Sequence, residues 1–275
     1  MQNYLIKAPH VTVITVCKNA GEDLIATCQS VLNQTVVNIQ FLIQDGVSTD
    51  KTLSYVSSIK DPRIDIISEP DSGIYDAMNR AFKHVRGKWC IYLNAGDCFY
   101  SNESLEQILA EAEADDNIEL FAFSYYNAFD KTITVHPRII SRYFLYRNGI
   151  SHQAQLWKTE VLHKYLPFDQ SYQVLADQNL LLRAFCSGIK IKSSKIVGVS
   201  YKDMGFSSML NVQPLKNYER QRIISSCFTS FERLLFGTFE IILLKSFRLR
   251  FNRTFRGTGL FRFYKTLANH INRIT

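Results

Sequence analysis

Three aspartates follow predicted strands, in the loops where a carboxylate can bind a cation or a polar ligand. They are Asp45, Asp71 and Asp97. Aspartate is a common turn residue, so loop formation alone accounts for any one of them. Three at the same edge of one sheet favour a site for a divalent cation and for the polar face of a nucleotide.

The segments that carry these acids alternate between strand-like and helix-like patterns. Apolar runs typical of buried strands cover residues 11–17, 39–43, 64–67 and 89–93, with helical spacing between them. Four strands and three helices within 100 residues predict an α/β fold with a mainly parallel sheet. Ligands of such sheets bind beyond the carboxyl ends of the strands, where the three acids lie.

The third predicted helix follows Ser72, which is its expected N-cap. Its apolar residues recur at the spacing of one helix face, and they are Ile74, Ala77, Met78, Ala81, Phe82 and Val85. We therefore expect this face to pack on the sheet and to hold the neighbouring loop in place.

Four segments resemble the motifs of family 2 glycosyltransferases, which have the GT-A fold, in the right order and spacing. These segments are VTVITVCKNAGEDLIATCQSVLNQT, IQDGVSTDKT, SEPDSGIYDAMNRAF and WCIYLNAGDCFY. The likeness extends from about Val11 to Gly205 and is greatest to bacterial enzymes that assemble surface polysaccharides of the colanic acid, O-antigen and capsule type. It implies a nucleotide-sugar donor, most simply a UDP-sugar, but does not specify the sugar.

The same resemblance implies roles for individual residues. Asp45 matches the acid that hydrogen-bonds uracil, and Asp97 matches the last acid of the DxD-type motif that binds Mn²⁺ or Mg²⁺. The usual acidic pair is reduced here to Gly96-Asp97, so phosphate and water must complete the metal shell. The remaining donor-binding residues implied by the resemblance are Thr15, Asn19, Asp71, Asp76, Asn79 and Asn94.

The acceptor side is predicted to lie in the second half of the chain. Asp177 resembles the family's catalytic acid near a helix start, where it would act as the base for an acceptor hydroxyl in an inverting transfer. His152 and Gln153 match an acceptor-binding motif of the subgroup. The QxxRW motif of processive synthases is absent between Gln178 and Arg183, which favours transfer of a single sugar.

Charge separates a catalytic domain, residues 1–215, from a tail, residues 216–275. The tail holds 12 Lys and Arg against 3 Asp and Glu, a net charge of +9, whereas the first 215 residues carry 20 against 22, a net charge of −2. Its basic residues alternate with Phe and Leu, which predicts helices lying on an anionic membrane surface. Packing on the core, or on a second subunit of a homo-oligomer, is the alternative.

The cysteines and the N-terminal residues predict a protein of a reducing compartment. The six cysteines show neither CxxC nor metal-ligand spacing, and residues 1–10 lack the apolar core of a signal peptide. We expect a cytoplasmic enzyme on the inner face of the cell membrane, near a lipid-linked or glycan acceptor.

Three other classes are weaker alternatives. A nucleic-acid-binding protein would explain the basic tail but not the acids at the strand ends, and no nucleic-acid partner is expected. A dinucleotide-binding protein needs a G-x-G-x-x-G after its first strand, where Lys18-Asn19-Ala20-Gly21 stands. An inactive nucleotide-sugar-binding relative remains an alternative because of Gly96, and donor turnover distinguishes it.

Overall fold

The computed structural model describes residues 8–202 and 210–239. The chain divides into two compact units, Met1–Ile223 and Ile224–Thr275. The first unit holds every site residue predicted from the sequence, whereas most of the predicted tail, residues 240–275, lies outside the described residues.

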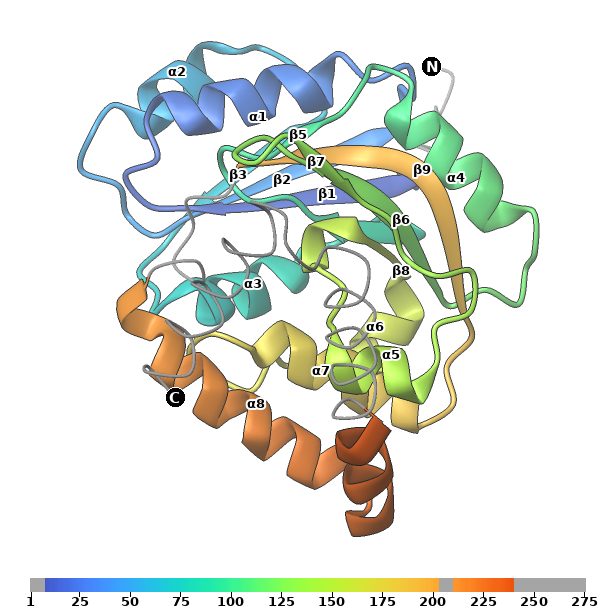
Figure 1. Cartoon of the computed structure of the whole chain (residues 1–275). Coiled ribbons are helices and arrows are strands. Elements are labelled where there is room, and N and C mark those ends of the chain that lie inside the picture. Colours follow the sequence, from blue (N-terminus) through green and yellow to red (C-terminus); the bar gives the residue numbers. More distant parts are fainter. Residues whose placement is uncertain (1–7, 203–209, 240–275) are drawn as a thin grey trace, which may run out of the picture. The chain divides into compact units, whose positions relative to one another are not determined.

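The first unit is built on one mixed sheet with helices on both faces. In Figure 1, α1 and α2 lie on one face, and α3, α6 and α7 lie on the other. The strands are β1 (Val11–Cys17), β2 (Ile39–Asp45), β3 (Ile64–Ser68), β4 (Trp89–Tyr92), β5 (Cys98–Phe99), β6 (Leu120–Asn127), β7 (Thr132–Thr134), β8 (Gln155–Lys158) and β9 (Ile191–Tyr201). The helices are α1 (Glu22–Leu32), α2 (Thr52–Ser58), α3 (Ile74–Phe82), α4 (Ser104–Glu113), α5 (Arg142–Arg147), the 3₁₀ turn η1 (His152–Ala154), α6 (Thr159–Tyr165), α7 (Ala176–Cys186), the 3₁₀ turn η3 (Leu210–Val212) and α8 (Gln213–Cys227).

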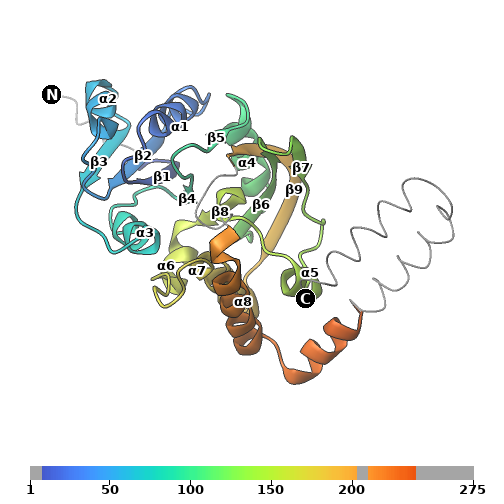
Figure 2. The same cartoon turned by 60° about the vertical axis from the view of Figure 1, so that its left-hand side comes forward.

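The strand order is β3-β2-β1-β4-β8-β6-β9-β5, with β7 added on β6. The first four strands in this order are parallel, as the sequence predicts. Beyond β4 the sheet changes direction, because β8 pairs antiparallel with both β4 and β6. The predicted α/β fold with a mainly parallel central sheet is confirmed, and Figure 2 shows the two halves of the sheet from the side.

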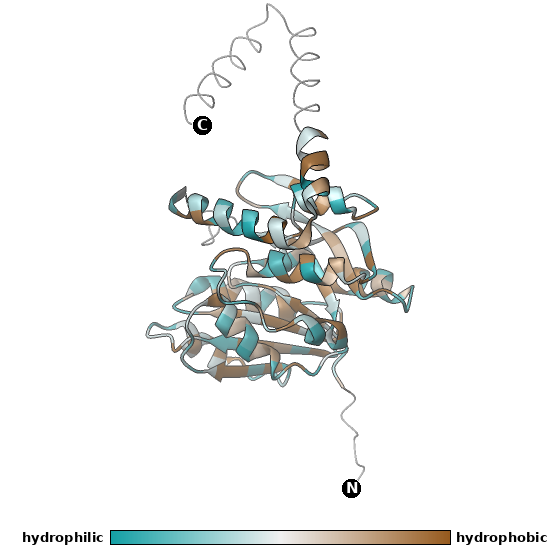
Figure 3. Cartoon of the chain, turned by 90° about the horizontal axis from the view of Figure 1, so that it is seen from below, coloured by the Kyte–Doolittle hydropathy of each residue, from teal (hydrophilic) through white to brown (hydrophobic). Residues whose placement is uncertain are grey.

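The core lies between the sheet and its helices. β1, β2 and β4 are buried along their whole length, which explains their unbroken apolar sequences. Figure 3 shows that the helices carry both hydrophobic and hydrophilic residues.

Helix α3 differs in detail from its prediction. Gly73 rather than Ser72 is the N-cap, and the Ser72 backbone N–H donates to Asp76. Tyr75 is buried, whereas Ile74 is 41% exposed. Ile74 has the spacing of the buried face but is the first residue of the helix, where it is exposed, and Tyr75 adds a buried hydroxyl beside that face.

The beginning of the predicted tail belongs to the first unit. The predicted boundary between residues 215 and 216 falls inside α8, and Glu219 and Ile223 of this helix are buried. Residues 230–239 are helical. Within the part of the chain that the structure describes, no helix is long and apolar enough to cross a membrane.

Candidate active site

Asp97 lies in the loop after β4, at the carboxyl end of the parallel strands. Its side chain is 3% exposed. Oδ1 accepts a hydrogen bond from the Lys202 backbone N–H at 2.9 Å, and Oδ2 accepts one from Gln153 Nε2 at 2.9 Å. Burial raises the pKa of Asp97 to about 6, although these two donors oppose the rise. The site therefore holds an acid that ionises near neutral pH.

A short 3₁₀ turn joins Asp97 to a second acid. Gln153 binds Asp97, and its neighbour His152 places Nδ1 3.1 Å from Asp177 Oδ2. On its other side, His152 Nε2 lies 3.0 Å from the Asn94 amide nitrogen. Because that amide donates to Nε2, the proton of the neutral imidazole stands on Nδ1 and donates to Asp177.

Asp177 lies in the first turn of α7, where a carboxylate suits the positive end of the helix dipole. Its Oδ1 accepts from the Gln178 backbone N–H at 2.8 Å and lies 3.2 Å from the Tyr75 hydroxyl. The side chains of His152 and Asp177 are 18% and 11% exposed, so a ligand can reach both. Asp177 is thus oriented from three sides while part of its carboxylate stays open.

Five residues predicted from different parts of the sequence therefore meet in one place. Asn94, His152 and Asp177 form one hydrogen-bonded row, and Gln153 extends it to Asp97. They come from the β4 loop, the turn η1 and the start of α7. Asp97 and Asp177 are linked through the dipeptide His152-Gln153. In this arrangement one carboxylate can bind a cation while the other accepts a proton.

Asp45 forms a second group, at the end of β2. Its carboxylate is fully buried and accepts hydrogen bonds from the Ser48 hydroxyl, the Ser48 backbone N–H and the Ser68 hydroxyl. Ser48 Oγ also accepts the backbone N–H of Asn19 at 2.8 Å. This network fixes the loops after β1 and β2 relative to each other.

Asp71 approaches the same loop from β3. A Cβ added at Gly46 would lie 2.3 Å from Asp71 Oδ2, so only glycine allows the carboxylate to approach the backbone there. Asp71 Oδ1 accepts the Gly73 backbone N–H at the start of α3. The structure therefore brings Asn19, Asp45 and Asp71 close together.

The other three predicted donor-binding residues have internal partners. The Thr15 hydroxyl donates to the Leu93 carbonyl at 2.7 Å and joins β1 to β4. The Asn79 amide exchanges two hydrogen bonds with the backbone of Phe168. Asp76 accepts the Ser72 backbone N–H, which lowers its pKa. A role in holding the loops around the site follows directly from these contacts.

Metal ligands are sparse around Asp97. Over residues 8–202 and 210–239, no group of three His, Cys, Asp or Glu side chains is placed to hold a metal ion. Asp97 is thus a single carboxylate, each of whose oxygens already accepts one hydrogen bond. A carboxylate oxygen retains a second lone pair, so Asp97 suits a cation whose other ligands come from a bound substrate.

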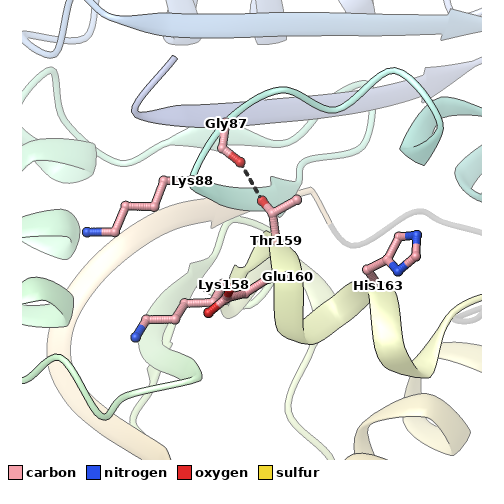
Figure 4. A pocket seen from close by; sticks show the side chains of 6 residues that line it. All are labelled: Gly87, Lys88, Lys158, Thr159, Glu160 and His163. Carbon is pink, nitrogen blue, oxygen red and sulfur yellow. Dashed lines mark hydrogen bonds between the residues drawn. The ribbon is translucent and has the colours of Figure 1, made fainter. Parts of the chain in front are cut away.

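A separate cavity lies at the opposite end of β4. It has a volume of about 480 Å³ and is lined by Gly87, Lys88, Lys158, Thr159, Glu160 and His163. Figure 4 shows that the Thr159 hydroxyl closes one wall by donating to the Gly87 carbonyl. Lys88 is paired with Glu113. This cavity is remote from Asp97 along the strand, and none of the predicted site residues lines it.

Sequence patterns missed two residues that support Asp177. Tyr75 approaches it directly, and burial raises the pKa of the tyrosine so that the hydroxyl keeps its proton. Glu219 lies behind the loop that precedes α7. Tyr75 lies beside the apolar face expected for α3 rather than within it, and a glutamate in a polar helix gives no signal of burial, so periodicity identifies neither residue.

Comparison with known proteins identifies the family. The family model described as Glycosyl transferase family 2 matches residues 12–171, which is more than half of the chain. The chain belongs to glycosyltransferase family 2. It is therefore a glycosyltransferase with the GT-A fold, as the four sequence motifs predicted.

Individual relatives support this assignment. The transferase is 29% identical over 212 residues to a PGL/p-HBAD biosynthesis glycosyltransferase of Mycobacterium tuberculosis, covering 72% of this chain and 78% of that protein. It is 30% identical over 200 residues to the Escherichia coli UDP-Glc:alpha-D-GlcNAc-diphosphoundecaprenol beta-1,3-glucosyltransferase WfaP, covering 70% and 76%.

Solved structures share the fold at low sequence identity. TarS residues 1–349 of S. aureus in complex with UDP has a TM-score of 0.62 at 16% identity, and the match covers 78% of this chain and 64% of that one, just under two thirds of its length. The mannosyltransferase PcManGT of Pyrobaculum calidifontis, in complex with GDP-Man and Mn²⁺, has a TM-score of 0.57 at 15% identity, covering 86% and 81%.

Proposed function

We propose that this transferase moves a single hexose from a UDP-sugar to a lipid-linked or growing surface-polysaccharide acceptor, with inversion at the anomeric carbon. One observation carries the proposal: Asp97 and Asp177 are held in one site by the neighbouring residues His152 and Gln153. Names of relatives support the choice of substrates, since WfaP uses UDP-Glc and a diphosphoundecaprenol-linked sugar.

Asp177 is the proposed base for the acceptor hydroxyl. It accepts the hydroxyl proton as the oxygen attacks the anomeric carbon and the bond to the diphosphate breaks. A carboxylate contributes here mainly through its position, which His152 Nδ1 and the Gln178 backbone N–H fix. Attack from the face opposite the leaving group inverts the anomeric configuration.

The donor lies, in this proposal, along the ends of β1, β2 and β4. Asp45 and Asp71 stand at the nucleoside end, and Asn94 stands near the sugar. Thr15, Asn19, Asp76 and Asn79 complete the proposed donor-binding set, and their contacts described above also hold the surrounding loops.

Asp97 is the residue that would hold Mn²⁺ or Mg²⁺. It fits that role because one carboxylate can bind the cation while the donor diphosphate supplies the other ligands. The ion would stabilise the negative charge that develops on the departing nucleoside diphosphate. PcManGT, which shares the fold, contains Mn²⁺ with its nucleotide-sugar. Gln153 and the Lys202 backbone N–H keep the carboxylate directed toward the site.

The basic tail is proposed to hold the enzyme on the inner face of the cell membrane, next to a lipid-linked acceptor. The net charge of +9 in residues 216–275 supports this proposal. Exposed apolar residues lie among these charges, with Phe231 71% and Leu234 67% exposed in the described part of the tail.

The test is a transfer assay with the full chain. UDP-glucose, UDP-galactose and UDP-GlcNAc are each offered with a synthetic α-D-GlcNAc-diphospho-lipid, in Mn²⁺, Mg²⁺ or EDTA. We expect one of the three donors to give a product with a single added sugar, in β configuration by its NMR coupling constant, and no product in EDTA. Donors that are bound but never consumed would indicate an inactive sugar-binding relative, and a retained α configuration would refute the inverting mechanism.

A further inference from the structure

Glu219 is a buried carboxylate that the catalytic scheme above does not use. It lies in α8, outside every family motif, and is 1% exposed. A glutamate is almost never fully buried unless its charge is compensated. The groups that surround it therefore indicate why it is there.

Three successive backbone N–H groups compensate this carboxylate. Oε1 accepts the N–H of Gln173 at 2.6 Å, and Oε2 accepts those of Val174 and Leu175 at 3.0 and 2.9 Å. Consecutive N–H groups that point into one concavity form an anion-binding nest. The carboxylate of one helix is thus held in a nest formed by a loop more than 40 residues earlier in the chain.

The loop with this nest leads directly into Asp177. Leu175 is the N-cap residue of α7, and Asp177 lies in the first turn. Next to Leu175, the Val174 carbonyl accepts the Tyr75 hydroxyl at 2.7 Å, and the same hydroxyl lies 3.2 Å from Asp177 Oδ1. Val174 is therefore bound to Glu219 through its N–H and to the tyrosine that orients Asp177 through its carbonyl.

Other residues of α8 fix the position of Glu219. Arg220 donates to the carbonyls of Tyr146 and Arg147 at the end of α5. The Arg222 guanidinium lies over the Tyr172 ring, 4.3 Å from its centroid. These contacts to α5 and to Tyr172 hold this part of α8 in addition to the three N–H groups that Glu219 binds.

From these contacts we infer that Glu219 is a positioning residue for the transfer reaction: it holds the loop 173–175, and thereby Asp177 and Tyr75, in the geometry that proton transfer requires. The inference rests on the proposed role of Asp177 as the base. It adds that catalysis depends on a residue of α8, outside the motifs that define the family.

The main test compares Glu219→Ala with Ile223→Ala. Ile223 is a buried residue of the same helix, so its truncation lowers stability without removing an acceptor from a backbone N–H. Hydrogen exchange of the amides 173–175 should become at least about 10-fold faster in Glu219→Ala, as expected when protecting hydrogen bonds are lost, and much less so in Ile223→Ala.

Kinetics give the functional readout, using the UDP-sugar that the wild type consumes. In Glu219→Ala we expect kcat to fall by roughly 10- to 100-fold, because a misplaced base loses its geometric contribution, with KM for the UDP-sugar unchanged within about twofold. Ile223→Ala should keep kcat at temperatures where it is folded. Formate should restore part of kcat in Glu219→Ala alone, because the emptied nest can bind a small carboxylate.

If Glu219→Ala does not fold, Glu219→Gln replaces it, since the amide keeps one acceptor oxygen for three donors. Unchanged exchange at 173–175, unchanged kcat, or an equal loss of kcat in Ile223→Ala would each overturn the inference. Asp177→Asn is measured in parallel to separate two failures. If Asp177→Asn is inactive while Glu219→Ala is fully active, the positioning role is refuted; if both are fully active, the proposed base is wrong as well.

Discussion

Replacing Asp97 by Asn should make the protein more stable while abolishing transfer. Burial raises the pKa of this carboxyl from 3.8 to about 6. At about 1.36 kcal/mol per pH unit, the difference corresponds to about 3 kcal/mol that the ionised carboxylate costs the folded state above pH 6. Asn cannot ionise and avoids this cost.

Hydrogen bonding reduces the expected gain. Oδ1 can still accept the Lys202 N–H, but the Asn amide would face Gln153 Nε2, and losing that bond costs about 1 kcal/mol. We therefore expect a net gain of about 1–2 kcal/mol near pH 8.

The sign of the pH dependence follows from the raised pKa. Below pH 3.8 the carboxyl is protonated in both folded and unfolded chains, so the wild type pays no ionisation cost there. This cost appears as the pH rises from 3.8 and is complete above about 6. The advantage of Asp97→Asn should therefore grow between pH 4 and pH 7 and then stay constant.

Urea denaturation in EDTA from pH 4.5 to pH 8 measures this advantage, and donor-dependent thermal stabilisation in Mn²⁺ measures function. Asp23→Asn is the control, because Asp23 is paired with Lys202 beside the site and its side chain is 46% exposed. If Asp97→Asn is destabilising by the same amount at every pH, burial does not penalise this carboxylate and the reasoning fails. If the variant keeps transfer activity, the assignment of the metal to Asp97 fails.

Three further predictions concern the base, the nucleoside end and the tail. Asp177→Asn should keep UDP-sugar binding and lower turnover by about 10²-fold or more, the usual size of a general-base contribution; unchanged turnover together with an inactive His152→Ala would move the base to the histidine. Asp45→Ala should raise KM for the donor more than it lowers kcat, because a nucleobase contact is equal in ground and transition states, and a fall in kcat alone would contradict this role. The full chain should co-sediment with anionic vesicles in a salt-sensitive manner. A chain that ends at residue 227 should keep α8 and bind the UDP-sugar but no longer co-sediment. A chain that ends at residue 215 loses most of α8 and should melt at a lower temperature. Retention of the 227-residue chain on vesicles would place the membrane contact elsewhere.

The parallel half of the fold was predictable because its signals are local. β1, β2 and β4 are buried along their length, and each is followed by a loop whose polar residues end the strand. The strand-end acids follow from this pattern, since carboxyl ends of parallel strands share one edge of the sheet. Ile74 shows the limit of periodicity, because it has the spacing of the buried face of α3 but is the first helical residue and is exposed.

The second half of the site depends on contacts between distant segments. His152 reaches Asp177 across 25 residues, and Asn94 reaches His152 across 58. No periodicity predicts such pairs, so these residues were expected only from resemblance to the family. The resemblance to the family did not indicate Glu219 either. Its partners are backbone N–H groups, and every residue type except proline has one, so the sequence does not reveal this contact.

The change from parallel to antiparallel pairing between β4 and β8 also bears on how such enzymes diversify. Residues proposed to contact the donor all precede Ala128, and those proposed for the acceptor all follow it. Recombination between family members in the segment after α4 should therefore exchange the acceptor side when the new half keeps the partners of Asn94, Asp97 and Tyr75, which are His152, Gln153 and Asp177. A chimaera must preserve two strand pairings between the halves: Trp89–Lys158 and Cys90–Trp157 join β4 to β8, and Cys98–Ser200 and Phe99–Val199 join β5 to β9.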